Sequence, residues 1–253
     1  YVEAQEGVGS YTFSSSGTHT VRTRAHVSFA YYIEKIETVI ISLTAPIPGQ
    51  APTTGYSTPL SYPGYTLSWN DEFDANSLSS DWVYELGNGN WGWGNNELQY
   101  YRQENVNVDN GILTITAKEE LFGGYNYTSG RIKTQGIRSF KYGRIDIRAA
   151  LPKGQGLWPA LWMLGDDITT ASWPACGEID IMELIGGTGA NDRTVHGTMH
   201  WDANGYASFG GSNSLASGTF GDEWHVFSII WDGNSIKFLR DDIQYHVMSI
   251  TGP

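Results

Sequence analysis

The sequence predicts an all-β protein built as a sandwich of two packed antiparallel sheets. Three observations support this prediction: 13% of the 253 residues are aromatic, glycine occurs 31 times, and short alternating or apolar runs recur between turn signals. Aromatic side chains favour strands, whereas glycine destabilises helix interiors. No long stretch keeps the apolar spacing of a helix, so we expect strands to bury the core between two facing sheets.

Strand-like segments dominate the chain beyond residue 65. Each is short, and each either alternates apolar with polar residues or is apolar throughout. Turn signals such as Asp109-Asn110-Gly111 and Asp232-Gly233-Asn234 separate them. The predicted strands are 111–117, 130–135, 142–151, 177–183, 195–201, 224–232 and 235–240.

Composition divides the chain into three parts. Five of the nine prolines lie between residues 46 and 64, which is typical of an extended, semi-rigid linker. All ten tryptophans follow this stretch. We therefore predict a small accessory module over 1–45, a Pro-rich linker over 46–64, and a catalytic domain over 65–253.

The predicted accessory module has strand character. Residues 11–27 alternate around a Ser-Gly turn, and residues 38–45 form a short β-branched run. The pattern Tyr11-x-Phe13-x-x-x-Gly17-x-His19-x-Val21 resembles the closing half of a PKD-type immunoglobulin-like module. A generic β spacer is the alternative, because 45 residues are few for a β-sandwich, which takes about 100.

Composition also excludes several classes of partner. The chain has 27 acidic and 15 basic residues, a net charge of −12, which disfavours nucleic acid because phosphate binding depends on Lys and Arg. No apolar run reaches the roughly 20 residues of a membrane-spanning helix. A single cysteine, Cys176, excludes an internal disulfide and a thiolate-rich metal site. The start at Tyr1, with neither Met nor a signal-like segment, is interpreted as a processed or excised piece. A cysteine-poor acidic chain fits both secretion and the cytosol, and we predict secretion.

The segment GEIDIME carries three acids, Glu178, Asp180 and Glu183. On a strand, Glu178 and Asp180 share one face and the intervening isoleucines point to the other. Strict alternation would send Glu183 into the core, where an unpaired carboxylate is costly. A β-bulge near Met182 would return Glu183 to the acidic face.

Three carboxyls on one face suit acid–base chemistry. Two carboxyls about 5–5.5 Å apart can divide the work of retaining glycoside hydrolysis between a nucleophile and a proton donor. A third, between them, can share a hydrogen bond with the nucleophile and help to keep the donor protonated. Two other interpretations stay open for this segment: an acidic edge strand that opposes aggregation, and a divalent metal site.

Three tryptophans precede the acidic segment in the sequence. Trp158 and Trp162 lie in GLWPALWML, and Trp173 lies just upstream of Glu178. An indole offers an apolar face for the C–H groups of a sugar ring and an N–H for its hydroxyls. Core packing is the alternative role for each of them.

Four motifs together carry a family resemblance: GWGNNELQYY, YGRIDIRAALP, GQGLWPALWMLG and WPACGEIDIME. They occur in the order found in the laminarinase branch of glycoside hydrolase family 16, and the chain resembles that branch over 65–253. The resemblance implies a concanavalin-like jelly roll whose cleft cuts β-1,3-glucan internally with retention. It implies that Glu178 is the nucleophile, Glu183 the general acid/base and Asp180 their assistant, and that the bulge is the laminarinase variant of the motif.

The resemblance also implies residues that bind substrate. Asn96 and Arg131 would bind glucosyl hydroxyls on the donor side, and the three tryptophans 158, 162 and 173 would line the cleft. His200 would lie near the scissile bond, although an ordinary paired histidine is the alternative.

Family members often hold a structural Ca²⁺, and no cofactor is expected for catalysis. Here the ligands would be the Glu72 carboxylate and the Gly111 carbonyl. The family's third ligand, an Asp near its C-terminus, has no counterpart before Pro253, and we expect the last strands of the domain to be missing from this sequence.

Two classes of function remain. The first is a monomeric, endo-acting β-1,3-glucanase whose partner is the polysaccharide. The second is a non-catalytic β-glucan-binding protein of the same fold, which the presence of all three acids disfavours. Among enzymes, mixed-linkage β-glucanases, agarases and carrageenases are alternatives, although sulfated substrates favour a more basic chain.

Overall fold

The computed structural model describes residues 17–28, 31–41, 51–187 and 189–251. The chain divides into two compact units, Tyr1–Ala51 and Pro52–Pro253. The first unit contains an antiparallel pair, β1 (Gly17–Ser28) and β2 (Tyr31–Ile41), in which Gly17 lies opposite Ile41. Tyr11 and Phe13 of the predicted PKD-like pattern lie outside the described residues, so that resemblance stays a prediction.

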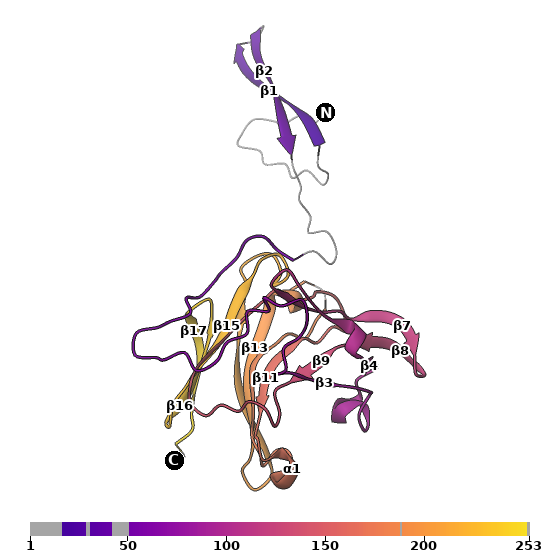
Figure 1. The fold of residues 1–253 in the computed structure, drawn as a ribbon. Helices are drawn as coiled ribbons and strands as arrows, with labels where there is room; N and C mark the ends of the chain where they lie inside the picture. The colour runs from indigo at the N-terminus through magenta and orange to yellow at the C-terminus, as the bar shows by residue number, and fades with distance from the viewer. Residues whose placement is uncertain (1–16, 29–30, 42–50, 188, 252–253) are drawn as a thin grey trace. The chain divides into compact units, whose positions relative to one another are not determined.

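Two four-stranded antiparallel sheets form the body of the second unit (Figure 1). One sheet has the order β10-β15-β16-β17, and we call it the outer sheet. The other has the order β11-β12-β13-β14, and we call it the site sheet. The strands are β10 (Gly143–Ala149), β15 (His225–Trp231), β16 (Ser235–Arg240), β17 (Ile243–Ser249), β11 (Ala160–Leu164), β12 (Glu178–Glu183), β13 (Thr194–Asp202) and β14 (Tyr206–Ser214).

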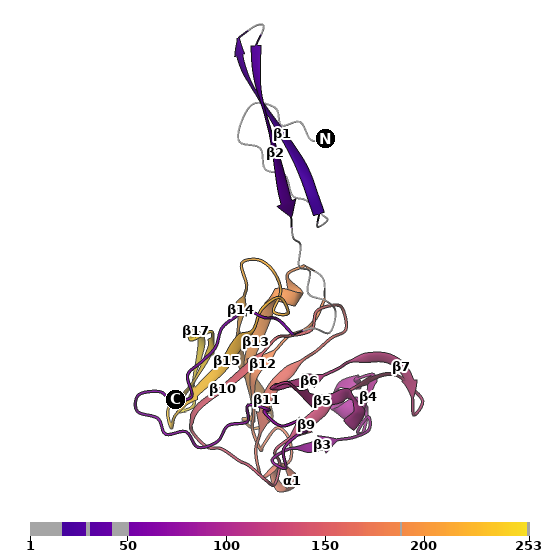
Figure 2. The same cartoon turned by 45° about the horizontal axis from the view of Figure 1, so that its top comes forward.

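Smaller sheets gather to one side of these two, as Figure 2 shows. One of them joins β4 to β8 in parallel, which departs from the antiparallel pairing predicted throughout. Their strands are β3 (Val83–Glu85), β4 (Gln99–Tyr101), β5 (Val106–Asp109), β6 (Ile112–Ile115), β7 (Lys118–Phe122), β8 (Tyr125–Ser129) and β9 (Arg131–Lys133). The predicted turn at Asn110-Gly111 joins β5 to β6, and both residues have the positive φ, 51° and 75°, of a tight hairpin.

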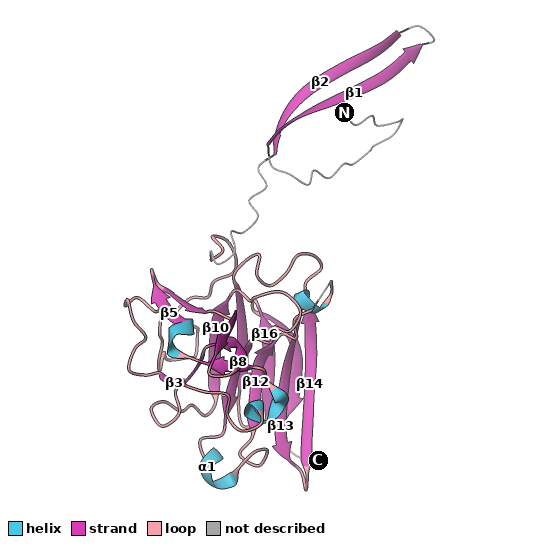
Figure 3. Ribbon diagram, turned by 90° about the vertical axis from the view of Figure 1, so that its right-hand side faces the viewer, coloured by secondary structure: helices cyan, strands magenta, loops and turns pink. Residues whose placement is uncertain are grey.

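Helical segments are short and lie between the strands (Figure 3). None in the described part of the chain is long and apolar enough to cross a membrane. They are η1 (Gly92–Asn96), η2 (Gln103–Asn105), α1 (Ile168–Ala171) and η3 (Asn191–Arg193).

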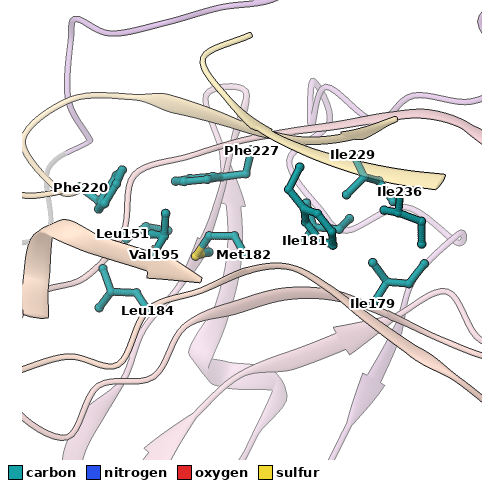
Figure 4. Close-up of a cluster of buried hydrophobic side chains, with 11 residues drawn as sticks. Leu151, Ile179, Ile181, Met182, Leu184, Val195, Phe220, Phe227, Ile229 and Ile236 are labelled. Atoms are coloured by element: carbon teal, nitrogen blue, oxygen red, sulfur yellow. The ribbon is translucent and has the colours of Figure 1, made fainter. Parts of the chain in front are cut away.

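The hydrophobic core lies between the outer sheet and the site sheet. Ile181 and Met182 of β12 face Phe227 and Ile229 of β15, and all four side chains are at most 1% exposed (Figure 4). Full burial of such side chains stabilises a fold by about 1.5–3 kcal/mol each. The predicted all-β sandwich is therefore confirmed, and the core fixes which face of β12 its acids can occupy.

The proline-rich stretch packs in part on the outer sheet. Gly55 forms a bridge to Trp224, and the Trp224 indole N–H donates to the Pro52 carbonyl over 2.6 Å. Further along, the Tyr62 hydroxyl donates to Asp146 of β10 over 2.9 Å. Residues 52–62 therefore form a strap on this sheet, although the domain limits of 46–64 and 65–253 stay predictions.

Candidate active site

The acids of GEIDIME lie on β12, an inner strand of the site sheet. Trp162 of β11 pairs with Asp180 and Leu161 pairs with Met182, so one residue of β12 is extra on this side. Against β13, Asp180 pairs with Thr198 and Glu183 with His196, again with one extra residue. The predicted bulge is therefore confirmed, and it lies between Asp180 and Glu183.

The bulge changes which residues face the core. Ile181 and Met182, although adjacent in sequence, are both buried in the hydrophobic cluster. Glu183 therefore returns to the face that carries Glu178 and Asp180. Asp180 is 2% exposed, whereas the two glutamates are intermediate in exposure. One face of β12 thus presents two partly accessible carboxyls on either side of a buried one.

Each glutamate accepts a hydrogen bond from an indole. The Trp158 Nε1–H donates to Glu183 Oε1 over 3.0 Å, and the Trp173 Nε1–H donates to Glu178 Oε2 over 2.6 Å. The two indoles are 47% and 49% exposed, so neither belongs to the core. About half of each tryptophan side chain therefore stays accessible while its N–H group orients a carboxyl. Beside Trp158 lies an apolar hollow of about 290 Å³, lined by Gly156, Leu157, Trp158, Ile185 and Gly186.

His200 contacts the buried carboxyl. Its Nε2 lies 2.9 Å from Asp180 Oδ2, and its Nδ1 lies 2.9 Å from the Tyr206 hydroxyl. The Tyr206 ring stacks on the imidazole at 17° and lies 5.2 Å from the Trp173 ring, centroid to centroid. His200 is therefore a paired histidine that also belongs to the carboxyl cluster.

Burial and mutual repulsion raise the pKa values of two of the acids. Burial raises the pKa of Asp180 to about 9, and the neighbouring charges of Glu183 and Glu178 add to the effect. Burial also raises the pKa of Glu183, although the Trp158 N–H and nearby His200 partly oppose it. Because the raised pKa of Asp180 lies above neutrality, the cluster keeps a proton on this buried carboxyl at neutral pH. It can therefore supply both a carboxylate and a proton donor.

Arg131 lies beside the cluster on β9. Its guanidinium is 4.7 Å from the Trp93 ring and 4.8 Å from the Trp162 ring, measured to the centroids. Its Nε also lies 2.6 Å from Glu85 Oε2. Trp162 is the register partner of Asp180, so Arg131 and Trp162 lie on the β11 side of the acids. The positive charge is held in place by aromatic rings and one carboxylate.

Asn96 is the last residue of the turn η1, and Trp93 of this turn contacts the Arg131 guanidinium. The turn has positive φ at several non-glycine positions, including 55° at Trp91 and 58° at Asn96. The Asn88 amide donates to the Glu97 and Gln99 carbonyls and holds the turn closed. Asn96 itself is exposed, and Trp93 links its turn to Arg131.

The two predicted Ca²⁺ ligands lie near one another. A Cβ built on Gly111 would be 4.0 Å from the Glu72 carbonyl oxygen, and the Glu72 side chain is exposed. Ca²⁺ takes six to eight oxygen ligands. The described residues contain no cluster of three or more His, Cys, Asp or Glu side chains suited to a metal, at GEIDIME or elsewhere.

Tyr206, Trp93 and Glu85 belong to the site but were not predicted from the sequence. Tyr206 follows a turn after β13, and only the β13–β14 register brings it to His200. Glu85 reaches Arg131 through the β3–β9 pairing. Trp93 lies inside the GWGNNELQYY motif, so its aromatic character next to Asn96 was the one signal available.

The site and the fold together define a class of protein. Half-buried carboxyls on one strand face, flanked by exposed indoles on a β-sandwich, form the kind of site used by glycoside hydrolases. The family model described as "Glycosyl hydrolases family 16" matches residues 94–251. The chain belongs to this family.

Relatives of known name fit this assignment. The chain is 43% identical over 190 residues to the clotting factor G alpha subunit of Tachypleus tridentatus, with 75% of this chain and 27% of that protein covered. It is 44% identical over 192 residues to a beta-glucanase of Rhodothermus marinus, with 73% and 65% covered. The chain thus spans under two thirds of either relative.

A solved structure supports the architecture. The laminarinase catalytic domain of Thermotoga maritima aligns with a TM-score of 0.69 at 45% identity, covering 73% of this chain and 77% of that one. The predicted jelly-roll sandwich is therefore confirmed.

Proposed function

We propose that this chain is an endo-acting, retaining β-1,3-glucanase of the laminarinase type. The observation that carries the proposal is the bulged strand β12, which brings Glu178, Asp180 and Glu183 to one face. The names of the relatives favour β-glucan over galactan substrates. The binding-protein alternative is disfavoured, since all three acids are present and two have raised pKa values.

In the first step, a Glu178 carboxylate oxygen attacks the anomeric carbon while the bond from that carbon to the leaving oxygen breaks. Glu183 gives its proton to the leaving oxygen, and a glycosyl ester forms on Glu178. In the second step, Glu183 takes a proton from water, the water oxygen attacks the anomeric carbon, and the Glu178 carboxylate is released. Asp180 hydrogen-bonds to Glu178 and keeps it oriented. No cofactor takes part.

The substrate contacts are part of the same proposal. Asn96 and Arg131 bind donor-side glucosyl hydroxyls from the β11 side of the acids. The tryptophans 158, 162 and 173 give stacking surfaces, and His200 lies near the scissile bond through its contact with Asp180. The partial exposure of Trp158 and Trp173 supports this, since a core role would have buried both side chains.

Reducing-sugar release from laminarin, lichenan, agarose and carrageenan tests the substrate class. We expect laminarin to be cleaved fastest, with internal cuts giving mixed oligosaccharides from the first minutes. Binding to laminarin without release of reducing ends would favour the binding-protein alternative. Preferred cleavage of agarose or carrageenan would overturn the β-glucan assignment.

Proton NMR of early laminarin hydrolysis tests retention. Glu178 and Glu183 are two strand positions apart once the bulge is discounted, about 6.5–7 Å along the backbone. Carboxyls that lean together from there leave no space for a water between one of them and the sugar. The β-anomer is expected first, and an added alcohol is expected to capture the intermediate. An α-anomer appearing first would contradict the double displacement.

The remaining assignments concern the setting of the enzyme. We propose secretion, a monomeric state, an accessory PKD-like module over 1–45, and a structural Ca²⁺ at Glu72 and Gly111. For the metal, the Tm should rise on adding Ca²⁺ and fall on adding EDTA. An unchanged Tm in the wild type and in Glu72→Gln would exclude a structural metal at this position.

A further inference from the structure

Tyr206 extends the carboxyl cluster outward from the active strand. Its hydroxyl is 2.9 Å from His200 Nδ1, and the other imidazole nitrogen is 2.9 Å from Asp180 Oδ2. Asp180 in turn forms a side-chain hydrogen bond with Glu178. Four groups on three neighbouring strands therefore form one continuous chain of hydrogen bonds that ends on the proposed nucleophile.

We propose that Tyr206 is a positioning residue that fixes the tautomer of His200 and so sets the direction of this chain. A neutral imidazole has one N–H and one bare nitrogen, and the partner of each nitrogen selects the tautomer. The Tyr206 O–H donates to Nδ1, the Nε2–H donates to Asp180, and the Asp180 proton lies toward Glu178. The expected effect on turnover rests on the proposed function, whereas the tautomer of His200 does not depend on it.

Hydrogen bonds that ran in the opposite direction would not stabilise Glu178 as an ionised nucleophile. If Nδ1 carried the proton and donated to the tyrosine oxygen, the bare Nε2 would have to accept from Asp180. The single proton of Asp180 would then point away from Glu178, and two acceptors would face each other. Because Asp180 is 2% exposed, no bulk water is available to relieve that repulsion. With the Asp180 proton toward Glu178 and the Nε2–H on Asp180, Nδ1 is bare and needs a donor, and the Tyr206 O–H is the group that supplies it.

The surroundings hold the tyrosine in place. Its ring stacks on His200 at a centroid distance of 5.7 Å and packs against Trp173 at 5.2 Å, although Tyr206 is 57% exposed. Trp173 donates its own N–H to Glu178. The groups that face His200 are thus Asp180, Glu178 and Glu183 of β12 and Tyr206 of β14, and no Lys or Arg of the described residues hydrogen-bonds to its ring.

Tyr206→Phe tests the proposal because it removes the hydroxyl and keeps the stacking ring. Tyr142→Phe is the matched control, since Tyr142 is 47% exposed and lies at the start of the outer sheet beside Trp231. We expect kcat on laminarin to fall about threefold to tenfold in Tyr206→Phe, the size of one lost hydrogen bond. The KM and the Tm should stay within about twofold and about 2 °C of the wild type, because an exposed hydroxyl contributes little to folding.

The direct measurement is the tautomer of His200, read from the ¹⁵N shifts of its ring by NMR. The wild type and Tyr142→Phe should show protonated Nε2 and bare Nδ1, and Tyr206→Phe should shift toward the other tautomer or toward exchange. Unchanged His200 shifts in Tyr206→Phe, or a wild type with protonated Nδ1, would overturn the proposal. These outcomes do not depend on turnover. Loss of all glucanase activity in the wild type would instead overturn the proposed function.

Discussion

The two large sheets each carry a cluster of carboxylates and aromatic side chains, and the two clusters behave in opposite ways. On the site sheet, Glu178, Asp180 and Glu183 face one another, and their hydrogen-bond partners are indoles and an imidazole. Burial and mutual repulsion raise the pKa values of Asp180 and Glu183. This cluster keeps a proton on Asp180 that an isolated carboxylate would release.

On the outer sheet, the carboxylates of Asp146, Asp241 and Asp242 each lie next to a cation. Arg144 contacts both Asp146 and Asp242, and Arg240 contacts Asp241 over 2.9 Å. Burial would raise the pKa of Asp241, but hydrogen bonds from His225 and the Val226 N–H, with the charge of Arg240, outweigh it and hold that pKa below its usual range.

The difference shows what separates a structural cluster from a chemical one. Residue types are similar on both sheets, and so is partial burial. The distribution of Arg decides the outcome, because a carboxylate next to a cation stays ionised and inert, while carboxylates facing one another share protons. Arg131, on the β11 side of the acids, has its Nε on Glu85 instead. Substitutions in the two clusters should therefore affect activity and stability separately.

The largest effect is expected from Glu178→Gln. The amide keeps the shape of the side chain and the Trp173 contact but cannot attack the anomeric carbon, so turnover should fall more than about a hundredfold. Laminarin affinity, measured by calorimetry, should stay near the wild-type value. Retention of more than about a hundredth of the activity would contradict the nucleophile assignment.

Asp180→Asn and Asp241→Asn should shift stability in opposite directions. Folded Asp180 keeps a proton up to about pH 9, whereas the unfolded chain releases it near its ordinary value of 3.8, so the free energy of unfolding falls as pH rises between these values. Asp180→Asn should therefore raise the Tm at pH 8 but not at pH 4. It should also lower kcat, because the amide cannot share a proton with Glu178.

The contribution of Asp241 to stability changes with pH in the opposite direction. Its lowered pKa contributes stability that is present above the unfolded value and is lost as pH falls through the folded value. Asp241→Asn should therefore lower the Tm at pH 8, with a smaller difference in acid, and leave kcat unchanged. Shifts of the same sign in both variants, measured by calorimetry at pH 4 and pH 8, would contradict the contrast between the sheets.

Trp173→Ala should have an intermediate effect, confined to activity. The variant removes an exposed stacking surface and the N–H on Glu178, so KM should rise and kcat should fall together, by about tenfold in kcat/KM. A core tryptophan would instead cost about 3–5 kcal/mol of stability. Trp224→Ala on the outer sheet is the matched control, because the Trp224 indole N–H donates to the Pro52 carbonyl and not to an acid of the site. An unchanged laminarin profile with a large fall in Tm would assign Trp173 to the core.

The sequence predicted the sandwich and the bulge because both follow from local patterns. Alternation on β12 left Glu183 on the wrong face, and the cost of burying it required one extra residue. Contacts across strands could not be predicted this way. Tyr206 meets His200 only through the β13–β14 register. The strap at 52–62 contains prolines that are typical of a linker, yet its Tyr62 packs on Arg144 and Asp146.

The smallest effect is expected from Tyr62→Phe, in the strap. The variant loses one hydrogen bond to Asp146, while Arg144 keeps its contact with that carboxylate at 2.9 Å and stays over the ring at 3.9 Å. A cost of about 1 kcal/mol in the free energy of unfolding, or about 2–4 °C in Tm, is expected at pH 7. Activity per folded molecule should not change, since the strap lies on the outer sheet.

The pH dependence of this Tm difference tests whether the Tyr62 hydroxyl causes it. Burial, with the hydrogen bond to Asp146, raises the pKa of Tyr62 to about 12. The hydroxyl therefore contributes stability that is complete below the unfolded value of 10.0 and is lost as pH rises through about 12. The Tm difference between wild type and Tyr62→Phe should close across that window, whereas Tyr65→Phe, at a tyrosine that is 45% exposed, should show no such convergence. A constant difference up to pH 12 would mean that the strap is held by its ring contact with Arg144, not by the hydrogen bond.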